Sequence, residues 1–326
     1  MKSGQNSSIG RKRSPTVNLS NTMIIEPIEG TPAATVTDVD LARLNENSWQ
    51  EIYQAFLQYG VLLFPAQHEL DDVGQSNFAR RFGNFEKTSP KQDGGTVAIA
   101  NTKSNGSVAK PGEYQYELLR GNEGWHTDST YMPLASKAAM LYAQVVPPEG
   151  GETGFADMRA AWDELDAETQ GKLEDLSAYH SLYYSQRNAG YQFSTDNLYG
   201  FHDKGAPLRP LIKTHPETGR KSIYTGRHAY GIVGMDPDES EQLLTKLMDD
   251  ACRPPRTYIH KWQPGDLVVW DNRCMMHCAR PYDTQYPRVL RGSRIAGDEA
   301  TELAPTFPDK RATAFNPTTS NQSSLS

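Results

Sequence analysis

The residues best suited to chemistry stand close together in the segment Gly124-Trp125-His126-Thr127-Asp128-Ser129. His126 and Asp128 are two residues apart, so on an extended strand their side chains project from the same face. Together they would supply two ligands of a facial triad, the two-histidine, one-carboxylate site that leaves coordination positions open on Fe(II). A His-x-Asp pair also occurs on surface strands that bind no metal, so the pattern needs a third ligand from elsewhere.

The remaining histidines are the first candidates for that third ligand. They are His68, His180, His202, His215, His228, His260 and His277. Each taken alone is more typical of a surface or hydrogen-bonded core histidine than of a metal ligand. His277 differs by its context, because it follows a Pro-Gly turn, an apolar strand over 267–270 and a polar corner over 271–273. Arg288 comes eleven residues after it.

Four ordered motifs extend this pattern along the chain. They are Trp125-His126-x-Asp128, Gly150-Gly151-x-Thr153, Trp270-Asp271-Asn272-Arg273 with His277 four residues on, and Arg288 followed by Ile295-Ala296-Gly297-Asp298. With these motifs the chain resembles the taurine dioxygenase / 2,4-dichlorophenoxyacetate dioxygenase family of Fe(II)- and 2-oxoglutarate-dependent oxygenases. The resemblance also takes in the first predicted helix and residues 60–65. It therefore covers nearly the whole folded body, and four motifs in order are more specific than any single one.

The resemblance implies a complete reaction centre. His126, Asp128 and His277 would be the ligands of Fe(II), and 2-oxoglutarate would chelate the iron while leaving a position for O₂. The distal carboxylate of 2-oxoglutarate would be held by Arg288 and by Thr153, which lies twenty-seven residues after His126. Arginine suits this role because its planar guanidinium can bind a carboxylate through two charge-assisted hydrogen bonds. The expected enzyme is a non-haem iron dioxygenase that releases succinate and CO₂.

One position departs from the family pattern and concerns the primary substrate. Sulfonate- and herbicide-oxidising members carry a second arginine four residues after the 2-oxoglutarate arginine, whereas this chain has Gly292 there. Arg291 and Arg294 are candidate replacements, although on a strand Arg291 points to the opposite face from Gly292. We expect a small organic substrate, bulkier or less acidic than taurine, with Asn122, Arg291 and Gly292 as candidate substrate residues. The sequence leaves hydroxylation, oxidative cleavage, desaturation and cyclisation open.

Periodicity predicts the elements that must position these residues. Ser48-x-x-Glu51 is a capping box before an apolar helical stripe, and Gly60 ends that helix ahead of a buried strand over 61–64. Further helices are predicted over 71–82, over 157–176 with a break at Gly171, and from Asp236 onward. Extended segments are predicted over 137–146, 213–215, 221–225, 257–262, 266–270 and 288–296.

Strands outnumber these helices and do not alternate with them regularly, which disfavours a doubly wound sheet. The predicted fold is an all-β core with flanking helices, a double-stranded β-helix or jelly roll. Polar tails over 1–22 and 312–326 are predicted to be disordered, which leaves one dioxygenase domain over 23–311. Two segments rich in Gly, Ser, Asn and Tyr, 88–120 and 179–201, are predicted to be substrate-covering loops.

Composition excludes several classes of partner. The 33 basic and 40 acidic residues give a formal charge of −7, which argues against nucleic-acid binding, since phosphate neutralisation needs a clustered basic surface. No apolar run approaches the roughly 18 residues of a membrane span, and the N-terminus has no apolar core of a secretory signal. Three cysteines cannot form a disulfide framework, so we expect a cytoplasmic enzyme. Family members often self-associate, so a homo-oligomer is compatible with the resemblance.

Three other functional classes stay open at this point. A β-barrel that binds a small ligand without catalysis would keep the scaffold, a cupin-type metal enzyme would use no keto acid, and a protein-modifying oxygenase would share the triad. Cupins generally carry His-x-His rather than His-x-Asp, and a cupin-type enzyme would leave Arg288 without a role. Separately, Cys274 and Cys278 lie close to His277 in sequence, which predicts oxidative inactivation if Cys278 is exposed.

Overall fold

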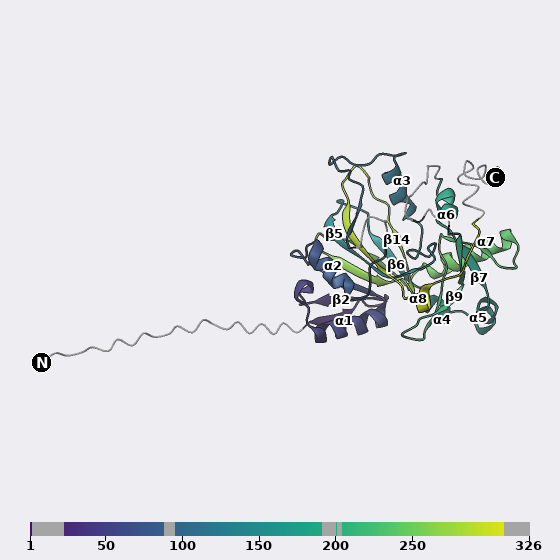
Figure 1. The fold of residues 1–326 in the computed structure, drawn as a ribbon, viewed down its shortest axis with the longest axis horizontal. Helices are drawn as coiled ribbons and strands as arrows, with labels where there is room; N and C mark the ends of the chain where they lie inside the picture. Colours follow the sequence, from purple (N-terminus) through teal and green to yellow (C-terminus); the bar gives the residue numbers. More distant parts are fainter. Residues whose placement is uncertain (2–22, 88–94, 191–199, 201–203, 310–326) are drawn as a thin grey trace, which may run out of the picture.

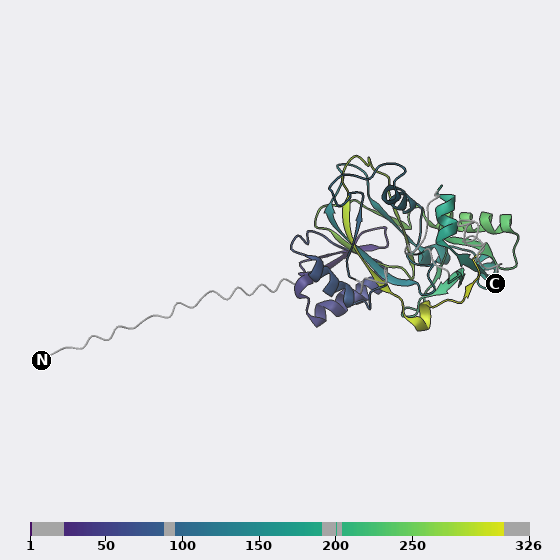
Figure 2. The same ribbon diagram turned by 45° about the horizontal axis from the view of Figure 1, so that its top comes forward.

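The computed structural model describes Met1 and residues 23–309, apart from 88–94, 191–199 and 201–203. The two predicted tails therefore lie, except for Met1, outside the described residues. Two views show the strands gathered between a pair of N-terminal helices on one side and a group of later helices on the other (Figure 1, Figure 2).

Helix α1 (Glu46–Tyr59) forms where its apolar stripe predicts it. The predicted capping box at Ser48 is wrong, because Asn45 is the N-cap and its side chain accepts a hydrogen bond from the Ser48 N–H. Gly60 ends the helix in the left-handed region, with a φ of 83°, and a Cβ there would lie 2.2 Å from Met275 Cε. The chain then enters β3 (Val61–Phe64), as predicted.

The largest sheet has seven strands in the order β1-β2-β3-β13-β5-β15-β4. Its other strands are β1 (Ile24–Pro27), β2 (Ala33–Thr37), β13 (Leu267–Asp271), β5 (Ser136–Val145), β15 (Val289–Ala296) and β4 (Val97–Ala100). Neighbouring strands are antiparallel except for β2 and β3, which run parallel. The extended segments predicted over 137–146, 266–270 and 288–296 are confirmed, and they lie side by side in this sheet.

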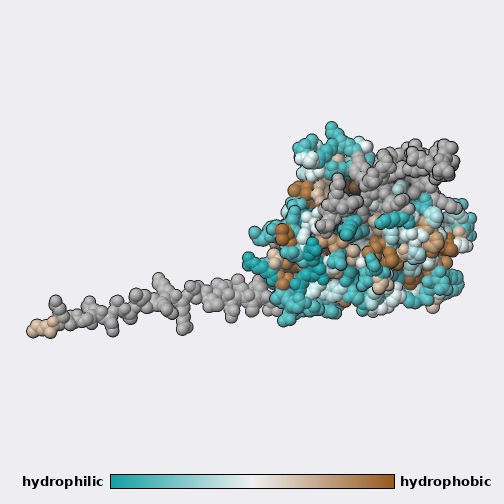
Figure 3. Space-filling model, in the orientation of Figure 1, coloured by the Kyte–Doolittle hydropathy of each residue, from teal (hydrophilic) through white to brown (hydrophobic). Residues whose placement is uncertain are grey.

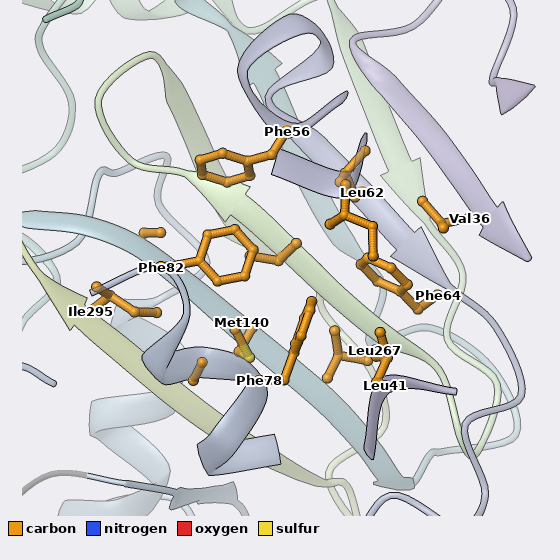
Figure 4. Packing of buried hydrophobic residues seen from close by; sticks show 14 of the residues in the cluster. Val36, Leu41, Phe56, Leu62, Phe64, Phe78, Phe82, Met140, Leu267 and Ile295 are labelled. Carbon is orange, nitrogen blue, oxygen red and sulfur yellow. The ribbon is translucent and has the colours of Figure 1, made fainter. Parts of the chain in front are cut away.

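Helices α1 and α2 (Asp72–Arg80) pack their apolar side chains against one face of this sheet (Figure 4). The ring centroids of Phe56 and Phe78 lie 5.0 and 5.4 Å from that of Phe82, in edge-to-face contacts. Met140 of β5 and Ile295 of β15 belong to the same buried cluster. Close packing of this kind resists deformation, so the helices restrict movement of β5 and β15 on the face of the sheet that they cover.

Three smaller sheets, all antiparallel, complete the strand arrangement. The first has the order β12-β6-β14 and comprises β12 (Thr257–His260), β6 (Thr153–Asp157) and β14 (Met275–Ala279). The second has the order β11-β7-β8-β16 and comprises β11 (Ala229–Ile232), β7 (Ser177–His180), β8 (Ala206–Pro210) and β16 (Thr306–Phe307). The third pairs β9 (Ile212–Thr214) with β10 (Lys221–Ile223).

The remaining helical elements connect and cover these sheets. They are η1 (Leu41–Arg43), α3 (Tyr114–Gly121), α4 (Met158–Asp163), α5 (Ala167–Leu173), α6 (Leu182–Asn188), α7 (Pro237–Ala251) and α8 (Glu299–Glu302). Helix α7 starts after the N-cap Asp236, as predicted. The break predicted at Gly171 is misplaced: it falls over 164–166, because Asp166 caps α5 and Gly171 lies inside that helix.

The two predicted covering loops are not structureless. The described part of 88–120 contains β4 and α3, and the described part of 179–201 contains the end of β7 and helix α6. Overall the described residues form a mixed α/β architecture with several separate sheets. On the face shown in Figure 3, hydrophobic residues are scattered among hydrophilic ones. No helix within the described residues is long and apolar enough to cross a membrane.

Candidate active site

His126 and His277 are brought together by their backbones. The N–H of each donates to the carbonyl oxygen of the other, at 2.9 and 2.8 Å, and the two ring centroids lie 4.2 Å apart. His277 is in the middle of β14, whereas the segment around His126 makes only this isolated bridge. His126 and Asp128 therefore do not share a regular strand, yet their side chains still converge.

Asp128 completes a compact group of three donors. Its Oδ2 lies 3.6 Å from His277 Nε2, and the candidate ligand atoms of His126, Asp128 and His277 all lie within 4.8 Å of one another. All three side chains are buried. His126 Nδ1 is 2.8 Å from the Gly124 carbonyl oxygen, so the hydrogen sits on Nδ1 and the Nε2 lone pair is left for a metal.

The electrostatics of the group also suit a divalent cation. Burial, followed by the charge of His277, lowers the pKa of His126 to about 3, and burial lowers the pKa of His277 as well. Burial by itself would raise the pKa of Asp128, but Arg294 and the two imidazoles outweigh it and hold that pKa below its ordinary value. Two neutral imidazoles and one carboxylate are the protonation states in which these groups ligate a metal.

Arg288 is a buried cation at the start of β15. Its Nε donates to the Gly151 carbonyl oxygen at 3.0 Å, and its guanidinium lies over the Tyr282 ring. Within the described residues no carboxylate comes within 4 Å of it, and burial lowers its pKa to about 10. A buried guanidinium without a carboxylate partner is costly unless an anion binds there, so the residue fits an anionic ligand.

Thr153 stands at the beginning of β6 and is oriented by a tryptophan. The Trp262 indole N–H donates to Thr153 Oγ1 at 3.0 Å, which leaves the threonine O–H free to donate to another acceptor. Trp262 and Thr153 are both buried.

One cavity of about 380 Å³ connects these groups. Its lining includes the three donors, Thr153 and Arg288, together with a largely apolar wall. That wall is formed by β4, β5, α3 and α6 through Val97, Ile99, Leu118, Leu119, Leu141 and Leu182. A cavity of this size accommodates a small organic molecule beside a keto acid.

The predicted substrate residues divide into two groups. Gly292 and Asn122 line the cavity, and a Cβ at position 292 would lie 3.3 Å from both Ile99 Cγ1 and Leu141 Cδ2. Arg291 does not line it. Its side chain points to the other face of β15, where it contacts Asp72, Gln75 and the Leu70 carbonyl oxygen. The prediction of Arg291 as a substrate residue is wrong, because strand alternation turns it away from the cavity.

Two cavity residues, Arg227 and Glu86, were missed by reasoning from the sequence, and His228 was considered there only as a metal ligand. Arg227 donates to Gln186 Oε1 at 3.0 Å, and its backbone N–H donates to the Trp125 carbonyl oxygen. His228, next to it, packs edge-on against His126 with centroids 5.8 Å apart. Glu86 also lines the cavity. Neither Arg227 nor Glu86 stands in a motif. The Gly226-Arg227-His228 run could have signalled Arg227, but no sequence pattern signals Glu86.

Two buried cysteines lie outside the candidate metal-binding group. Cys274 and Cys278 are both buried, with Cys278 fully inaccessible, which removes the basis for oxidative inactivation through Cys278. A second cluster, His215, Asp271 and Cys274, also has donor atoms within 4.8 Å of one another. Asp271 there is already bound by Arg273 through two hydrogen bonds, so this cluster is a buried salt bridge with its cation in place.

The fold and the buried His-Asp-His group beside a buried arginine define a class, the non-haem iron oxygenases that bind a keto acid. The family profile described as "Taurine catabolism dioxygenase TauD, TfdA family" matches residues 25–294. The chain belongs to this family, and it is an α-ketoglutarate-dependent non-haem iron dioxygenase.

Individual relatives agree with the family. The chain is 49% identical over 286 residues to the (S)-phenoxypropionate/alpha-ketoglutarate-dioxygenase of Sphingobium herbicidovorans, covering 86% of this chain and 97% of the relative. It is 35% identical over 286 residues to the alpha-ketoglutarate-dependent 2,4-dichlorophenoxyacetate dioxygenase of Cupriavidus pinatubonensis, covering 85% and 98%. The crystal structure of AAD-2 in complex with Mn(II) and N-oxalylglycine superposes with a TM-score of 0.78 at 36% identity, covering 86% and 98%.

Proposed function

We propose that this enzyme oxidises an aryloxyalkanoic acid, with His126, Asp128 and His277 binding Fe(II) and with Arg288 and Thr153 holding the distal carboxylate of 2-oxoglutarate. The observation that carries the cofactor roles is the common cavity of the three donors and Arg288, a buried cation with no carboxylate within 4 Å among the described residues. When bound, iron and 2-oxoglutarate supply the activation of O₂ that is coupled to loss of CO₂ and formation of succinate.

The apolar wall supports an aromatic substrate. Val97, Ile99 and Leu141 lie close around Gly292, so the cavity has an apolar lining suited to a flat ring where other family members place an arginine. Burial of a ring against such side chains is favourable by about 25 cal/mol for each Å² of apolar surface removed from water. The relatives named above act on phenoxypropionate and on 2,4-dichlorophenoxyacetate, both of which carry an aryl ring.

The position of Arg227 favours a substrate that carries a carboxylate at the end opposite its aromatic ring. Arg227 lines the same cavity as the metal-binding group, and its charge helps to lower the pKa of His126. We infer that the substrate carboxylate approaches Arg227, which places the carbon between the ether oxygen and the carboxylate close to the iron site. Hydroxylation of that carbon gives a hemiacetal, which collapses to a phenol and a 2-keto acid. Oxidative cleavage is thus the outcome we propose.

The enclosing fold supports the same proposal. A buried cluster between the seven-stranded sheet and the β12-β6-β14 sheet takes Val61, Ala139 and Val268 from one and Phe155 and Met275 from the other. We propose that these two sheets are the facing walls of a double-stranded β-helix, the jelly roll expected from the sequence. We also propose that residues 23–311 form one dioxygenase domain.

Two measurements test the proposed function. Anaerobic addition of Fe(II) and 2-oxoglutarate should produce the metal-to-ligand charge-transfer band of a chelated keto acid, and His277→Ala should lack it. Succinate and phenol should then form in equal amounts from a 2-aryloxypropionic acid, each enantiomer assayed separately. If the charge-transfer band forms but neither enantiomer yields phenol, the proposed substrate class is contradicted, whereas the assignment of the iron and 2-oxoglutarate residues stands.

A further inference from the structure

Asp128 is followed by a residue in an unusual backbone conformation. Ser129 is fully buried and has a φ of 56°, in the left-handed region that residues with a Cβ rarely adopt. Such strain persists where surrounding contacts fix it, and it concentrates at functional sites. The contact here comes from Glu86, whose Oε2 accepts a 2.8 Å hydrogen bond from Ser129 Oγ.

Glu86 is itself tied to the strand that carries Arg294. The Glu86 N–H donates to the Arg294 carbonyl oxygen at 2.9 Å, and Arg294 Nε lies 3.7 Å from Glu86 Oε2. Arg294 also approaches Ser129, with 3.4 Å between Nη1 and Oγ. Glu86, Ser129 and Arg294 therefore form a connected group around the turn that follows Asp128.

Arg294 reaches from this group to one oxygen of Asp128. Its Nη2 lies 3.0 Å from Asp128 Oδ1, whereas the other oxygen, Oδ2, faces His277 Nε2 at 3.6 Å and accepts a long, 3.5 Å hydrogen bond from Asn272 Nδ2. The two carboxylate oxygens thus have different surroundings. One accepts from a guanidinium, and the other points toward the imidazole with which it would share a metal.

We infer that Arg294 is a positioning residue for metal binding: it holds Asp128 Oδ1 so that Oδ2 alone is presented to the iron. Glu86 balances the charge of Arg294 and fixes its backbone, and the strained turn at Ser129 keeps the carboxylate in place. The inference rests on the proposed role of Asp128 as a metal ligand. It also explains why Arg294, although it lines the cavity, does not replace the arginine that is missing at position 292.

The test is a measurement of Mn(II) affinity. Mn(II) is titrated into the metal-free full-length enzyme with 2-oxoglutarate present, and the free Mn(II) is measured by electron paramagnetic resonance. Residues that orient a metal ligand typically change affinity by 10- to 100-fold, so Arg294→Met should weaken Mn(II) binding by about that factor. Arg294→Lys should restore part of it, since an ammonium can still donate to Oδ1. The matched control is Arg291→Met, which removes a buried, ion-paired arginine from the opposite face of the same strand.

The control separates positioning from general damage to the fold. Arg291→Met should lower the melting temperature and leave Mn(II) affinity unchanged. If Arg294→Met binds Mn(II) like the wild type and raises only the KM for the aryloxy acid, Arg294 is a substrate residue and the inference is overturned. Equal loss of affinity in both methionine variants would also overturn it. Failure of the wild-type enzyme to bind Mn(II) would instead contradict the proposed metal site.

Discussion

His277 and His126 exchange both of their backbone hydrogen bonds, which sets the centroids of their rings 4.2 Å apart although 150 residues of chain separate them. Because the bonds are made by the main chain, the pair does not depend on a metal to hold the two imidazoles together. The site is therefore largely organised before any ligand arrives, which reduces the ordering cost of binding.

Arg288→Gln should raise the KM for 2-oxoglutarate by about 10- to 100-fold, since a charge-assisted hydrogen bond contributes about 1.5–3 kcal/mol. The KM for the aryloxy acid should change little, because Arg288 is assigned to the cosubstrate. Steady-state succinate release with each substrate varied in turn measures both constants. Arg43→Gln removes an exposed arginine that does not line the cavity and is the control. An equal effect of Arg288→Gln on both KM values would contradict the assignment.

Arg227→Gln should affect the other substrate, the aryloxy acid, and not 2-oxoglutarate. It should raise the KM for the aryloxy acid by at least about tenfold, because a buried carboxylate would lose its charged partner, and leave the KM for 2-oxoglutarate nearly unchanged. Glutamine is chosen because it retains a hydrogen-bond donor toward Gln186. The same assay with a neutral aryl ether should show no difference between the variant and the wild type. A difference there would mean that Arg227 acts on packing and not on charge.

Gly292→Leu should fill the space that we assign to the aryl ring. A Cβ at this position already lies 3.3 Å from Ile99 and Leu141, so larger side chains must project into the cavity or displace its wall. We expect kcat/KM for a chlorinated aryloxy acid to fall by at least about tenfold, in the range that one or two extra carbons impose in a shaped pocket. Gly292→Ala should have a smaller effect. Unchanged turnover in the leucine variant would place the ring elsewhere.

Asp271→Asn should destabilise the fold strongly. Asp271 is fully buried and accepts hydrogen bonds from Arg273 at 2.8 and 2.7 Å, and removing one partner of such a pair costs about 3–5 kcal/mol. The control Asp163→Asn breaks a largely exposed pair with Arg220 and should cost at most about 1 kcal/mol. Urea unfolding at neutral pH measures both free energies.

The same carboxyl predicts a pH dependence. Burial acts to raise the pKa of Asp271, but Arg273 and His215 outweigh it and hold the folded-state pKa below the ordinary value. A carboxyl of this kind stabilises the fold above its unfolded pKa of about 3.9, and the contribution is lost as the pH falls toward the folded-state pKa. The stability difference between wild type and Asp271→Asn should therefore shrink below about pH 4. A difference independent of pH would contradict this.

Sequence reasoning worked best where chemistry is confined to a short stretch. The His126-x-Asp128 pair, His277 and Arg288 stand in motifs with fixed spacing, and the family they indicate is confirmed. Helix α1 and strand β3 were also predictable, since an apolar stripe ending at Gly60 depends on neighbouring residues only. The cap at Asn45 and the break before α5 were missed, because several polar residues there can cap a helix equally well.

The sequence by itself therefore determined the reaction class and the identities of the candidate ligands, because motifs record residue types at set intervals. Only the tertiary structure decided which side chains share the cavity. It added Arg227 and Glu86, it placed Arg294 against Asp128, and it turned Arg291 outward to Asp72. The physical reason is that strand pairing joins residues far apart in the chain, and a shift of a single position on a strand sends a side chain to the opposite face.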